Sequence, residues 1–396
     1  MEKAVLTLDC GATNVKASLI GTHGQIIASY SLPNKTVPDP FHAGGLIWDV
    51  DNIWNSLAIC SRKICSSIKN IEITAVTVTT FGVDGAAVKK DGTLLYPVIS
   101  WQCNRTEAIA KNIAKYYDPD WLYRISGLQS YHFNTIYKLV WLRENRPDVL
   151  KEMDYYVMLP SLLIYRLCGE FVTDTTSAGT TMLTDLGTRD FSSDILNVIG
   201  LSTSIFPRLV EPGTVAGYIS PKAAESLGIS SGIAAIAAGH DTQFAILASG
   251  ARINQPILSS GTWEILMVRT QAASLKMPSR DSGVTIELDA QPGILNAGVQ
   301  WAASGVLEWL GRLLYPDIAE GSSRYTAMIK EAGSIPPGSS GLSIIPELYP
   351  GGFSGRQGSM KGFTHETPRA HIYRAGLEAL SFYSFYGLKR LELAGN

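Results

Sequence analysis

The segment that follows the first predicted strand combines residue types that suit a bound phosphate group. It reads Asp9-Cys10-Gly11-Ala12-Thr13-Asn14-Val15-Lys16. Small residues let a phosphate approach the backbone N–H groups, and Thr13 and Asn14 can donate hydrogen bonds from their side chains. Asp9 could hold Mg²⁺, which prefers a carboxylate and retained waters, and Lys16 could neutralise a phosphate oxygen. An ordinary hairpin turn explains the same residues equally well.

A carboxylate that follows an apolar run is the main feature of a second segment, Ala237-Ala238-Gly239-His240-Asp241-Thr242-Gln243. Adjacent polar side chains are costly in a core but natural in the wall of a site. Asp241 could accept a hydroxyl proton as a general base. Asp241 or Thr242 could instead cap the helix that follows, through the amides of the Phe244–Leu247 turn.

A second hydroxyl-rich turn, Ser259-Ser260-Gly261-Thr262, also suits phosphates, although a simple turn is an equal alternative. Two turns of this kind with a carboxylate between them in the chain favour phosphoryl transfer. The chain contains neither GxxxxGK[ST] nor GxGxxG, so a P-loop NTPase and a dinucleotide enzyme lack support.

Three further segments could bind the acceptor of such a transfer. Phe81-Gly82-Val83-Asp84-Gly85 places a glycine and a carboxylate at the end of a predicted strand. Trp101-Gln102-Cys103-Asn104-Arg105 offers an indole face beside amide and guanidinium donors, which suits polyols, although core packing is the alternative for Trp101. His132 could either cap a helix or contact a substrate.

The elements that must position these residues begin with β structure. We predict three strands joined as antiparallel hairpins, then a helix with apolar residues at helical spacing, then an apolar strand buried on both faces. These elements cover residues 4–9, 15–20, 25–31, 50–69 and 71–81. Asp91-Gly92 predicts a further hairpin. The first segment therefore reads β-β-β-α-β.

Helical patterns dominate the next part of the chain, and a second β region follows them. The predicted helices include residues 136–143, 155–167, 298–314 and 371–393. The second β region begins near Ile233, and the run from 256 to 268 predicts two strands around the Gly261-Thr262 turn. The two halves thus echo each other, each opening with a strand and a phosphate-type turn.

Length and composition limit the class of protein. The 396 residues are enough for two or three domains of about 150 residues each. With 45% hydrophobic and 17% charged residues, the chain is not a disordered segment, a coiled coil or a collagen-like rod. Its formal charge of −2 comes from 33 Lys and Arg against 35 Asp and Glu, without a basic block, so we expect no nucleic-acid partner.

The sequence also predicts a cytoplasmic protein without a membrane segment. The first apolar run is broken by Asp9 and has no cleavage site, which argues against a signal peptide. The longest apolar candidate, residues 233–251, is interrupted by His240-Asp241. Five cysteines without a CxxC pair are better explained as thiols in a reducing compartment than as disulfides or zinc ligands.

Taken together, these motifs resemble the FGGY carbohydrate kinases of the actin-like superfamily, and within that family most closely the branch that acts on L-fuculose. The resemblance covers essentially the whole chain. It rests on Thr7–Lys16, Thr79–Ala86, Tyr96–Trp101, Ala238–Ala245 and Leu258–Arg269. It implies two RNase-H-like α/β domains with a cleft between them, which we expect at residues 1–243 and 244–396.

The resemblance also implies roles for individual residues. Asp241 matches the general base, and Asp9 lies near Mg²⁺. The sugar-binding positions are Gly82, Val83, Asp84, His132, His240 and Thr242. The nucleotide-binding positions are Gly11, Ala12, Thr13, Asn14, Lys16, Thr262 and Gly305. Backbone donors, Mg²⁺, a lysine and one base are sufficient parts for phosphoryl transfer, which depends on positioning and charge neutralisation.

The implied reaction converts ATP and L-fuculose into ADP and L-fuculose 1-phosphate. Recognition of one methyl group discriminates by only about 1–3 kcal/mol, so L-rhamnulose, D-ribulose and xylulose stay open as substrates. A non-catalytic sugar-binding protein and an actin-like ATPase are further alternatives. The oligomeric state is also open, with a homodimer among the options.

The end of the chain departs from the family pattern. Members of the family continue for about 80 residues beyond the position that matches Asn396, with a glycine-rich segment that contacts adenosine. We therefore expect the second domain to be truncated, with an incomplete nucleotide site and an exposed sheet edge.

Overall fold

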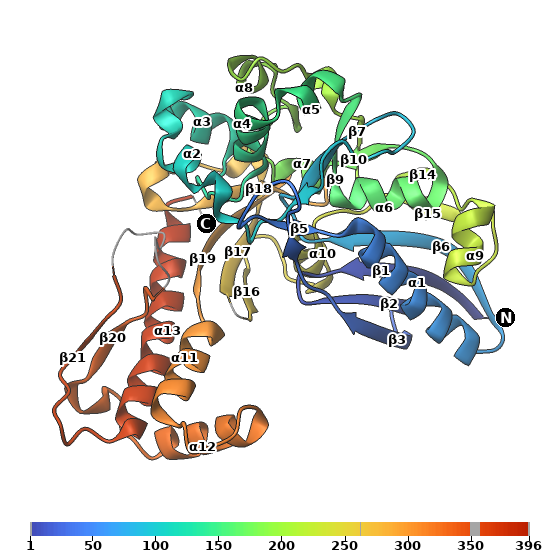
Figure 1. The fold of residues 1–396 in the computed structure, drawn as a ribbon. Coiled ribbons are helices and arrows are strands. Elements are labelled where there is room, and N and C mark those ends of the chain that lie inside the picture. Colours follow the sequence, from blue (N-terminus) through green and yellow to red (C-terminus); the bar gives the residue numbers. More distant parts are fainter. Residues whose placement is uncertain (1, 262, 349–356, 395–396) are drawn as a thin grey trace. The chain divides into compact units, whose positions relative to one another are not determined.

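The computed structural model describes residues 2–261, 263–348 and 357–394, which form two compact units (Figure 1). Unit 1 comprises Met1–Gly250 and Ile286–Leu295, and unit 2 comprises Ala251–Thr285 and Asn296–Asn396. Both units combine helices with β-sheet, which confirms the α/β class. The domain boundary after Gln243 stays a prediction.

A six-stranded sheet forms the centre of unit 1, with the strand order β14-β15-β6-β1-β2-β3. Its strands are β1 (Glu2–Cys10), β2 (Asn14–Gly21), β3 (Ile26–Pro33), β6 (Ile71–Thr80), β14 (Val215–Tyr218) and β15 (Ala234–Ile236). The first three strands are antiparallel neighbours, as predicted. β6 runs parallel to both β1 and β15. The β-β-β-α-β order is confirmed, with two short unpredicted strands, β4 (Val37–Pro38) and β5 (Leu46–Trp48), inserted before the helix.

One face of this sheet is fully buried under helices, and the other is only half-buried. The packed helices are α1 (Val50–Ser67), α6 (Leu159–Cys168) and α9 (Pro221–Leu227). In β6, Val76 and Val78 are buried while Thr77 and Thr79 are half-buried. The expectation that this strand is buried on both faces was therefore wrong. Its threonines alternate with apolar residues, and successive side chains of a strand point to opposite faces, so the threonines lie on the less buried face.

The helix α1 starts where the sequence supplies a cap. The side chain of Asp49 accepts a hydrogen bond from the backbone N–H of Asn52, which satisfies one of the free donors of the first turn. The apolar residues Ile53, Leu57 and Ile64 then face the sheet.

The rest of unit 1 is largely helical and has its own apolar core. Its α-helices are α2 (Glu107–Lys111), α3 (Pro119–Ser126), α4 (Thr135–Asn145), α5 (Pro147–Glu152), α7 (Thr175–Gly179), α8 (Ser193–Val198) and α10 (Asp241–Ala248). Its other strands are β7 (Gly85–Val88), β8 (Val98–Ile99), β9 (Tyr155–Met158), β10 (Val172–Asp174), β11 (Thr184–Asp185), β12 (Asp190–Phe191), β13 (Arg208–Val210) and β18 (Thr285–Leu288).

Two predictions for this region have different outcomes. The hairpin at Asp91-Gly92 is confirmed: Gly92 has a positive φ of 83°, and Val88 and Leu94 form an antiparallel bridge. The predicted helix over 155–167 was wrong at its start, because Tyr155–Met158 form β9 and pair with β7. Pro160 lies in the first turn of α6, where its missing N–H costs nothing, so the helix begins only there.

Unit 2 contains β16 (Pro256–Ser260), β17 (Trp263–Gln271) and most of β19 (Ile294–Ala302), which are neighbours in that order. Its helices are α11 (Ser304–Leu314), α12 (Ser322–Gly333) and α13 (Arg369–Glu392), and its short strands are β20 (Ser343–Ile345) and β21 (Ser359–Lys361). The helix predicted from 371 to 393 is confirmed by α13. The helix predicted from 298 was wrong before Ser304, because those residues continue β19.

The helix α13 packs tightly on the strands of unit 2 because a glycine removes the side chain at the contact. A Cβ on Gly387 would lie 3.0 Å from the ring of Trp301 and 3.1 Å from a methyl group of Leu266.

Among the residues that the structure describes, no helix has the length and apolarity needed to span a bilayer.

Candidate functional site

Three parallel neighbouring strands of unit 1 end at one edge of the sheet. The carboxyl ends of β1, β6 and β15 lead to Asp9, Gly82 and His240, respectively. A parallel bridge joins Thr80 to His240, and a Cβ on Gly82 would lie 3.2 Å from Cδ2 of His240. Open α/β sheets bind ligands outside the carboxyl ends of their parallel strands. The structure thus brings these predicted residues together.

Asp241 follows directly at the start of α10, in the first turn of that helix. The N-cap position belongs to His240, which makes no side-chain cap hydrogen bond, so the helix-capping alternative for Asp241 and Thr242 was wrong. The backbone N–H of Thr242 donates to Oδ1 of Asp241 at 2.6 Å. The side chain of Asp241 is 35% exposed, and burial of the group raises its pKa to about 6. A carboxylate of this kind can accept a proton near neutral pH.

Asp9 lies on the half-buried face of the sheet, together with two residues from neighbouring strands. Lys16 is its partner across β2, with Nζ 3.8 Å from Oδ2 of Asp9. The hydroxyl of Thr79 on β6 donates to Oδ1 of Asp9 at 3.3 Å. Burial raises the pKa of Asp9, and the nearby charge of Asp241 raises it further. The two carboxylates therefore repel each other, and a cation near them would relieve that repulsion.

The predicted phosphate turn between β1 and β2 is held from behind by Asn34. Its side-chain amide donates to the carbonyl of Gly11 at 2.9 Å, and its backbone N–H donates to the carbonyl of Thr13 at 2.7 Å. Ala12 is half-buried, whereas Thr13 and Asn14 are exposed and could meet a ligand. Asn34 could not be predicted as part of the site, because no local pattern connects it to a turn about twenty residues earlier.

Asp84 has the opposite character, because protein groups surround its carboxylate completely. Its side chain is 0% exposed. Oδ1 pairs with the ammonium of Lys138, and Oδ2 accepts from Trp48 Nε1 at 2.6 Å and from the backbone N–H of Trp101 at 3.0 Å. Lys138 was not predicted as part of the site, because in the sequence it looks like an ordinary residue of a helix surface.

The neighbouring Val83 has a left-handed backbone, with φ of 65°, which is strained for a β-branched residue. Three side chains hold it in place. Thr180 Oγ1 accepts from its N–H at 2.9 Å, while Thr135 Oγ1 and Lys138 Nζ donate to its carbonyl at 2.8 and 3.0 Å. Strain that is held in this way accompanies functional turns.

His132 is linked to this turn through aromatic contacts. Its ring meets Phe133 edge-on at 5.4 Å, and Phe133 meets Trp101 edge-on at 6.3 Å. Trp101 in turn donates its backbone N–H to Asp84. Burial lowers the pKa of His132, so its imidazole is neutral at physiological pH.

The residues predicted on the second phosphate turn belong to unit 2. The backbone N–H of Ser304 donates to the carbonyl of Gly261 at 3.1 Å, which places the start of α11, and hence Gly305, beside that turn. Thr262 lies outside the described residues. The structure thus joins Gly261 to Gly305, whereas the other candidate residues form their own group in unit 1.

The carboxylates of Asp9 and Asp241 at the edge of unit 1 are of the ligand type that Mg²⁺ prefers. In the described part of the chain, no group of three or more His, Cys, Asp or Glu side chains is arranged so that it could hold a metal ion. Mg²⁺ needs only one or two carboxylates, because it keeps several of its waters. The charge repulsion between Asp9 and Asp241 fits such an ion.

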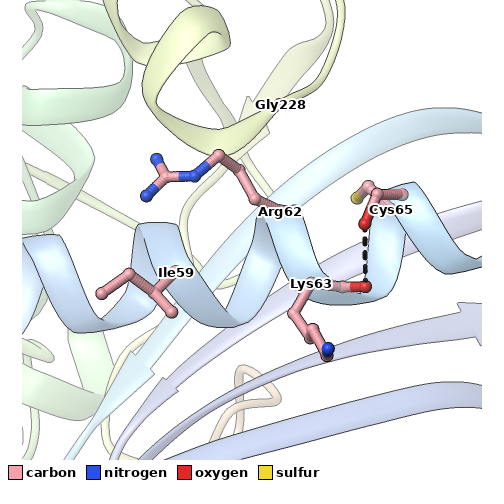
Figure 2. Close-up of a pocket in the computed structure, with 6 residues that line it drawn as sticks. Ile59, Arg62, Lys63, Cys65 and Gly228 are labelled. Atoms are coloured by element: carbon pink, nitrogen blue, oxygen red, sulfur yellow. Dashed lines mark hydrogen bonds between the residues drawn. The ribbon is translucent and has the colours of Figure 1, made fainter.

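A shallow, open depression of about 480 Å³ lies elsewhere in unit 1, on the outer side of α1 (Figure 2). It is lined by Ile59, Arg62, Lys63, Cys65, Ser66 and Gly228. The dashed line in Figure 2 marks the hydrogen bond from Ser66 Oγ to the carbonyl of Lys63. None of the predicted site residues lines this depression, and it contains no carboxylate or imidazole.

Family models match both parts of the chain. The model for the N-terminal domain of the FGGY family of carbohydrate kinases matches residues 4–248, and the model for the C-terminal domain of that family matches residues 257–395. The expectation of a truncated second domain is therefore not supported: the C-terminal domain is present.

Similar proteins agree with this result. The chain is 43% identical to L-fuculokinase of Escherichia coli (strain K12), over 100% of this chain and 82% of that protein. It is 40% identical to L-fuculokinase of Haemophilus influenzae, over 95% of this chain and 80% of that protein. The solved structure of xylulose kinase from Rhodospirillum rubrum has a TM-score of 0.89 at 21% identity, covering 99% of this chain and 79% of that one. The chain belongs to the FGGY family of carbohydrate kinases.

Proposed function

We propose that this chain is a kinase that transfers the γ-phosphoryl group of ATP to a primary hydroxyl of L-fuculose, giving L-fuculose 1-phosphate. The observation that carries the proposal is Asp241, a partly exposed carboxylate at the edge where three parallel strands end, with a pKa of about 6. The choice of sugar is supported by the identity of 40–43% to L-fuculokinases over nearly the whole chain.

In this proposal Asp241 accepts the proton of the sugar hydroxyl as the oxygen attacks phosphorus. A base with a pKa near 6 is deprotonated at pH 7 and still accepts a proton in the transition state. Gly82 and Thr242 line the sugar site beside His240. Asp84 contributes from behind, because its buried carboxylate holds the backbone of Trp101 and, through Lys138, the strained Val83.

The nucleotide side of the proposal uses the turn that Asn34 holds. The backbone N–H groups of Gly11–Asn14 and the ammonium of Lys16 would neutralise phosphate oxygens. Thr262 and Gly305 are proposed to contribute from unit 2. Asp9 would hold Mg²⁺ through water, and the ion would supply charge neutralisation on the phosphates. We also propose a cytoplasmic location, since the five cysteines are unpaired thiols.

The test is a coupled assay of ADP release with ATP, Mg²⁺ and a panel of L-fuculose, L-rhamnulose, D-ribulose and D-xylulose. We expect the highest kcat/KM with L-fuculose and no sugar-dependent ADP release by the Asp241→Asn variant. A higher kcat/KM with another ketose would contradict the choice of sugar. ATP hydrolysis that is indifferent to sugar would contradict the kinase itself.

A further inference from the structure

A second carboxylate, largely shielded from solvent, lies beside His240, on a strand that the motifs do not include. Glu287 is in β18, within the same compact unit as Asp241, and its side chain is only 16% exposed. The imidazole of His240 lies between the two carboxylates. Its Nε2 is 3.6 Å from Oδ1 of Asp241, and its Nδ1 is 3.7 Å from Oε2 of Glu287.

Both partners of this contact are held firmly by other groups. The side-chain amide of Gln243 donates to Oε2 of Glu287 at 2.6 Å, which fixes the oxygen that faces the imidazole. The backbone N–H of His240 donates to Thr176 Oγ1 at 3.0 Å. Gly82 leaves no space behind the ring, since a Cβ there would lie 3.2 Å from Cδ2 of His240. The backbone of His240 and the Cδ2 edge of its ring are therefore confined.

Glu287 lies on the Nδ1 side of His240, which bears on which ring nitrogen carries the proton. A neutral imidazole has one N–H and one lone pair, and a carboxylate beside one nitrogen favours the proton there. Nδ1 is buried and makes no hydrogen bond to the described residues, and Glu287 Oε2, 3.7 Å away, is the carboxylate oxygen that faces it, a small shift from hydrogen-bond distance. Asp174 is a fully buried carboxylate whose charge also acts on this imidazole; its Oδ1 accepts from the amides of Thr176 and Ser177, and its Oδ2 is buried without a hydrogen bond to the described residues.

We propose that Glu287 is a positioning residue that keeps the proton of His240 on Nδ1, so that the lone pair of Nε2 points towards the Asp241 side. There it accepts a hydrogen bond from a hydroxyl of the sugar other than the one that reacts. This role rests on the proposed function. It keeps Asp241 available as a base, because an Nε2–H directed at Asp241 would stabilise the carboxylate and weaken it as a proton acceptor.

The role implies a class of substrate. The sugar must present a hydroxyl donor to Nε2 while its primary hydroxyl faces Asp241. A ketose with a free hydroxyl near the reacting carbon meets this requirement. An analogue that lacks this neighbouring hydroxyl does not. Discrimination against the analogue comes from Nε2, which the analogue leaves without the hydrogen bond that the sugar hydroxyl would donate.

Two variants separate the acceptor oxygen of Glu287 from its charge. Glu287→Met removes the acceptor, and we expect the KM for the sugar to rise about tenfold, the effect of one lost hydrogen bond, with the KM for ATP changed less than about twofold. Glu287→Gln keeps an oxygen that can accept from both Gln243 and Nδ1, and we expect it to restore the KM to within about threefold. Glu366→Met is the matched control, since Glu366 lies 3.7 Å from His365 but both side chains are more than 80% exposed.

The second measurement is ¹⁵N NMR of protein labelled at histidine, with the resonance of His240 assigned through His240→Gln. We expect the Nδ1–H form in the unmodified protein and in Glu287→Gln, and a shift towards the Nε2–H form in Glu287→Met. An Nε2–H form in the unmodified protein overturns the proposal, whether or not a variant folds. Equal sugar KM values for folded Glu287→Met and the unmodified protein also overturn it. The NMR measurement needs no sugar, so it tests the role of Glu287 even in a protein without turnover. An absence of turnover would contradict the kinase proposal alone.

Discussion

Asp84 and Asp241 look alike in the sequence, yet the structure gives them opposite surroundings. Each follows a glycine and an apolar strand of the central sheet of unit 1. The carboxylate of Asp84 is 0% exposed, paired with Lys138, and hydrogen-bonded to two tryptophans. The carboxylate of Asp241 is 35% exposed, and its hydrogen bonds come from Thr242.

The difference separates a carboxylate that holds structure from one that can take part in chemistry. A buried carboxylate with a full set of donors has no lone pair left for a substrate, and removing it leaves Lys138 without compensation. A desolvated carboxylate with few donors has a raised pKa and can still accept a proton. Four predictions test this contrast, in order of decreasing effect.

The largest effect should come from Asp241→Asn. We expect kcat/KM for the sugar to fall by about 10²–10⁴-fold, the usual contribution of a general base. Stability should move in the opposite direction at pH 7.5, with a gain of about 1 kcal/mol after solvent screening, because the variant no longer keeps a desolvated charge. Steady-state kinetics and urea unfolding measure the two quantities. The same substitution at the exposed Asp281 is the control.

The sign of the stability change depends on pH. The pKa of Asp241 is raised in the folded protein to about 6, so ionisation destabilises the fold as pH rises through that value. The gain of Asp241→Asn should therefore disappear below about pH 4, where both side chains are neutral. Equal activity of the variant and the unmodified protein would remove Asp241 from the catalytic role.

The second effect concerns stability rather than chemistry. Asp84→Asn should destabilise the protein by about 3 kcal/mol, because it leaves the buried ammonium of Lys138 without its countercharge. The double variant Asp84→Asn/Lys138→Met should recover most of this loss, since neither buried charge is left. The midpoint of urea unfolding measures both changes. If the double variant is as unstable as Asp84→Asn alone, the unpaired ammonium of Lys138 is not the cause of the lost stability.

The third effect is the pH dependence of turnover. Because Asp241 must be deprotonated to act as a base, kcat/KM for the sugar should rise with pH through about 6 and then level off. At pH 5 we expect about a tenth of the plateau value. A profile that stays flat from pH 5 to pH 8 would contradict the assignment, and the residual activity of Asp241→Asn should lack this rise.

The smallest effect is expected at Lys16. Lys16→Met should raise the KM for ATP by about tenfold, the value of a charge-assisted hydrogen bond, and should change stability by less than about 0.5 kcal/mol. Lys89→Met is a matched control, because Lys89 makes a comparable surface pair with Glu152 at 3.7 Å. An equal effect of both variants on the KM for ATP would contradict a specific role for Lys16.

Local sequence patterns predicted the elements that carry their own signals. The three opening strands, the helix α1 and the turn at Gly92 follow from alternation, helical spacing and the glycine of a hairpin. The errors occurred where a strand runs directly into a helix, at Tyr155–Met158 and before Ser304. An apolar run has no internal mark of that change, because partners far away in the chain decide it.

The candidate site divides in the same way. Residue types and motif spacing were sufficient to find Asp9, Asp241 and the turn from Gly11 to Asn14, because the chemistry of each lies within a few consecutive residues. Asn34, Lys138 and Glu287 contact the turn at Gly11, Asp84 and His240, respectively, across the fold and from segments that are distant in the chain. Their amide, ammonium and carboxylate groups are ordinary in any surface sequence.

The sequence by itself determined the family, the α/β class and the residues that could bind phosphate and accept a proton. Only the tertiary structure decided which carboxylate is available for chemistry. The availability of a carboxylate depends on burial and on the donors around it, and both are set by side chains that the fold brings from other strands and helices. Asp84 and Asp241 therefore differ in their neighbours, although they are the same residue at similar places in the sequence.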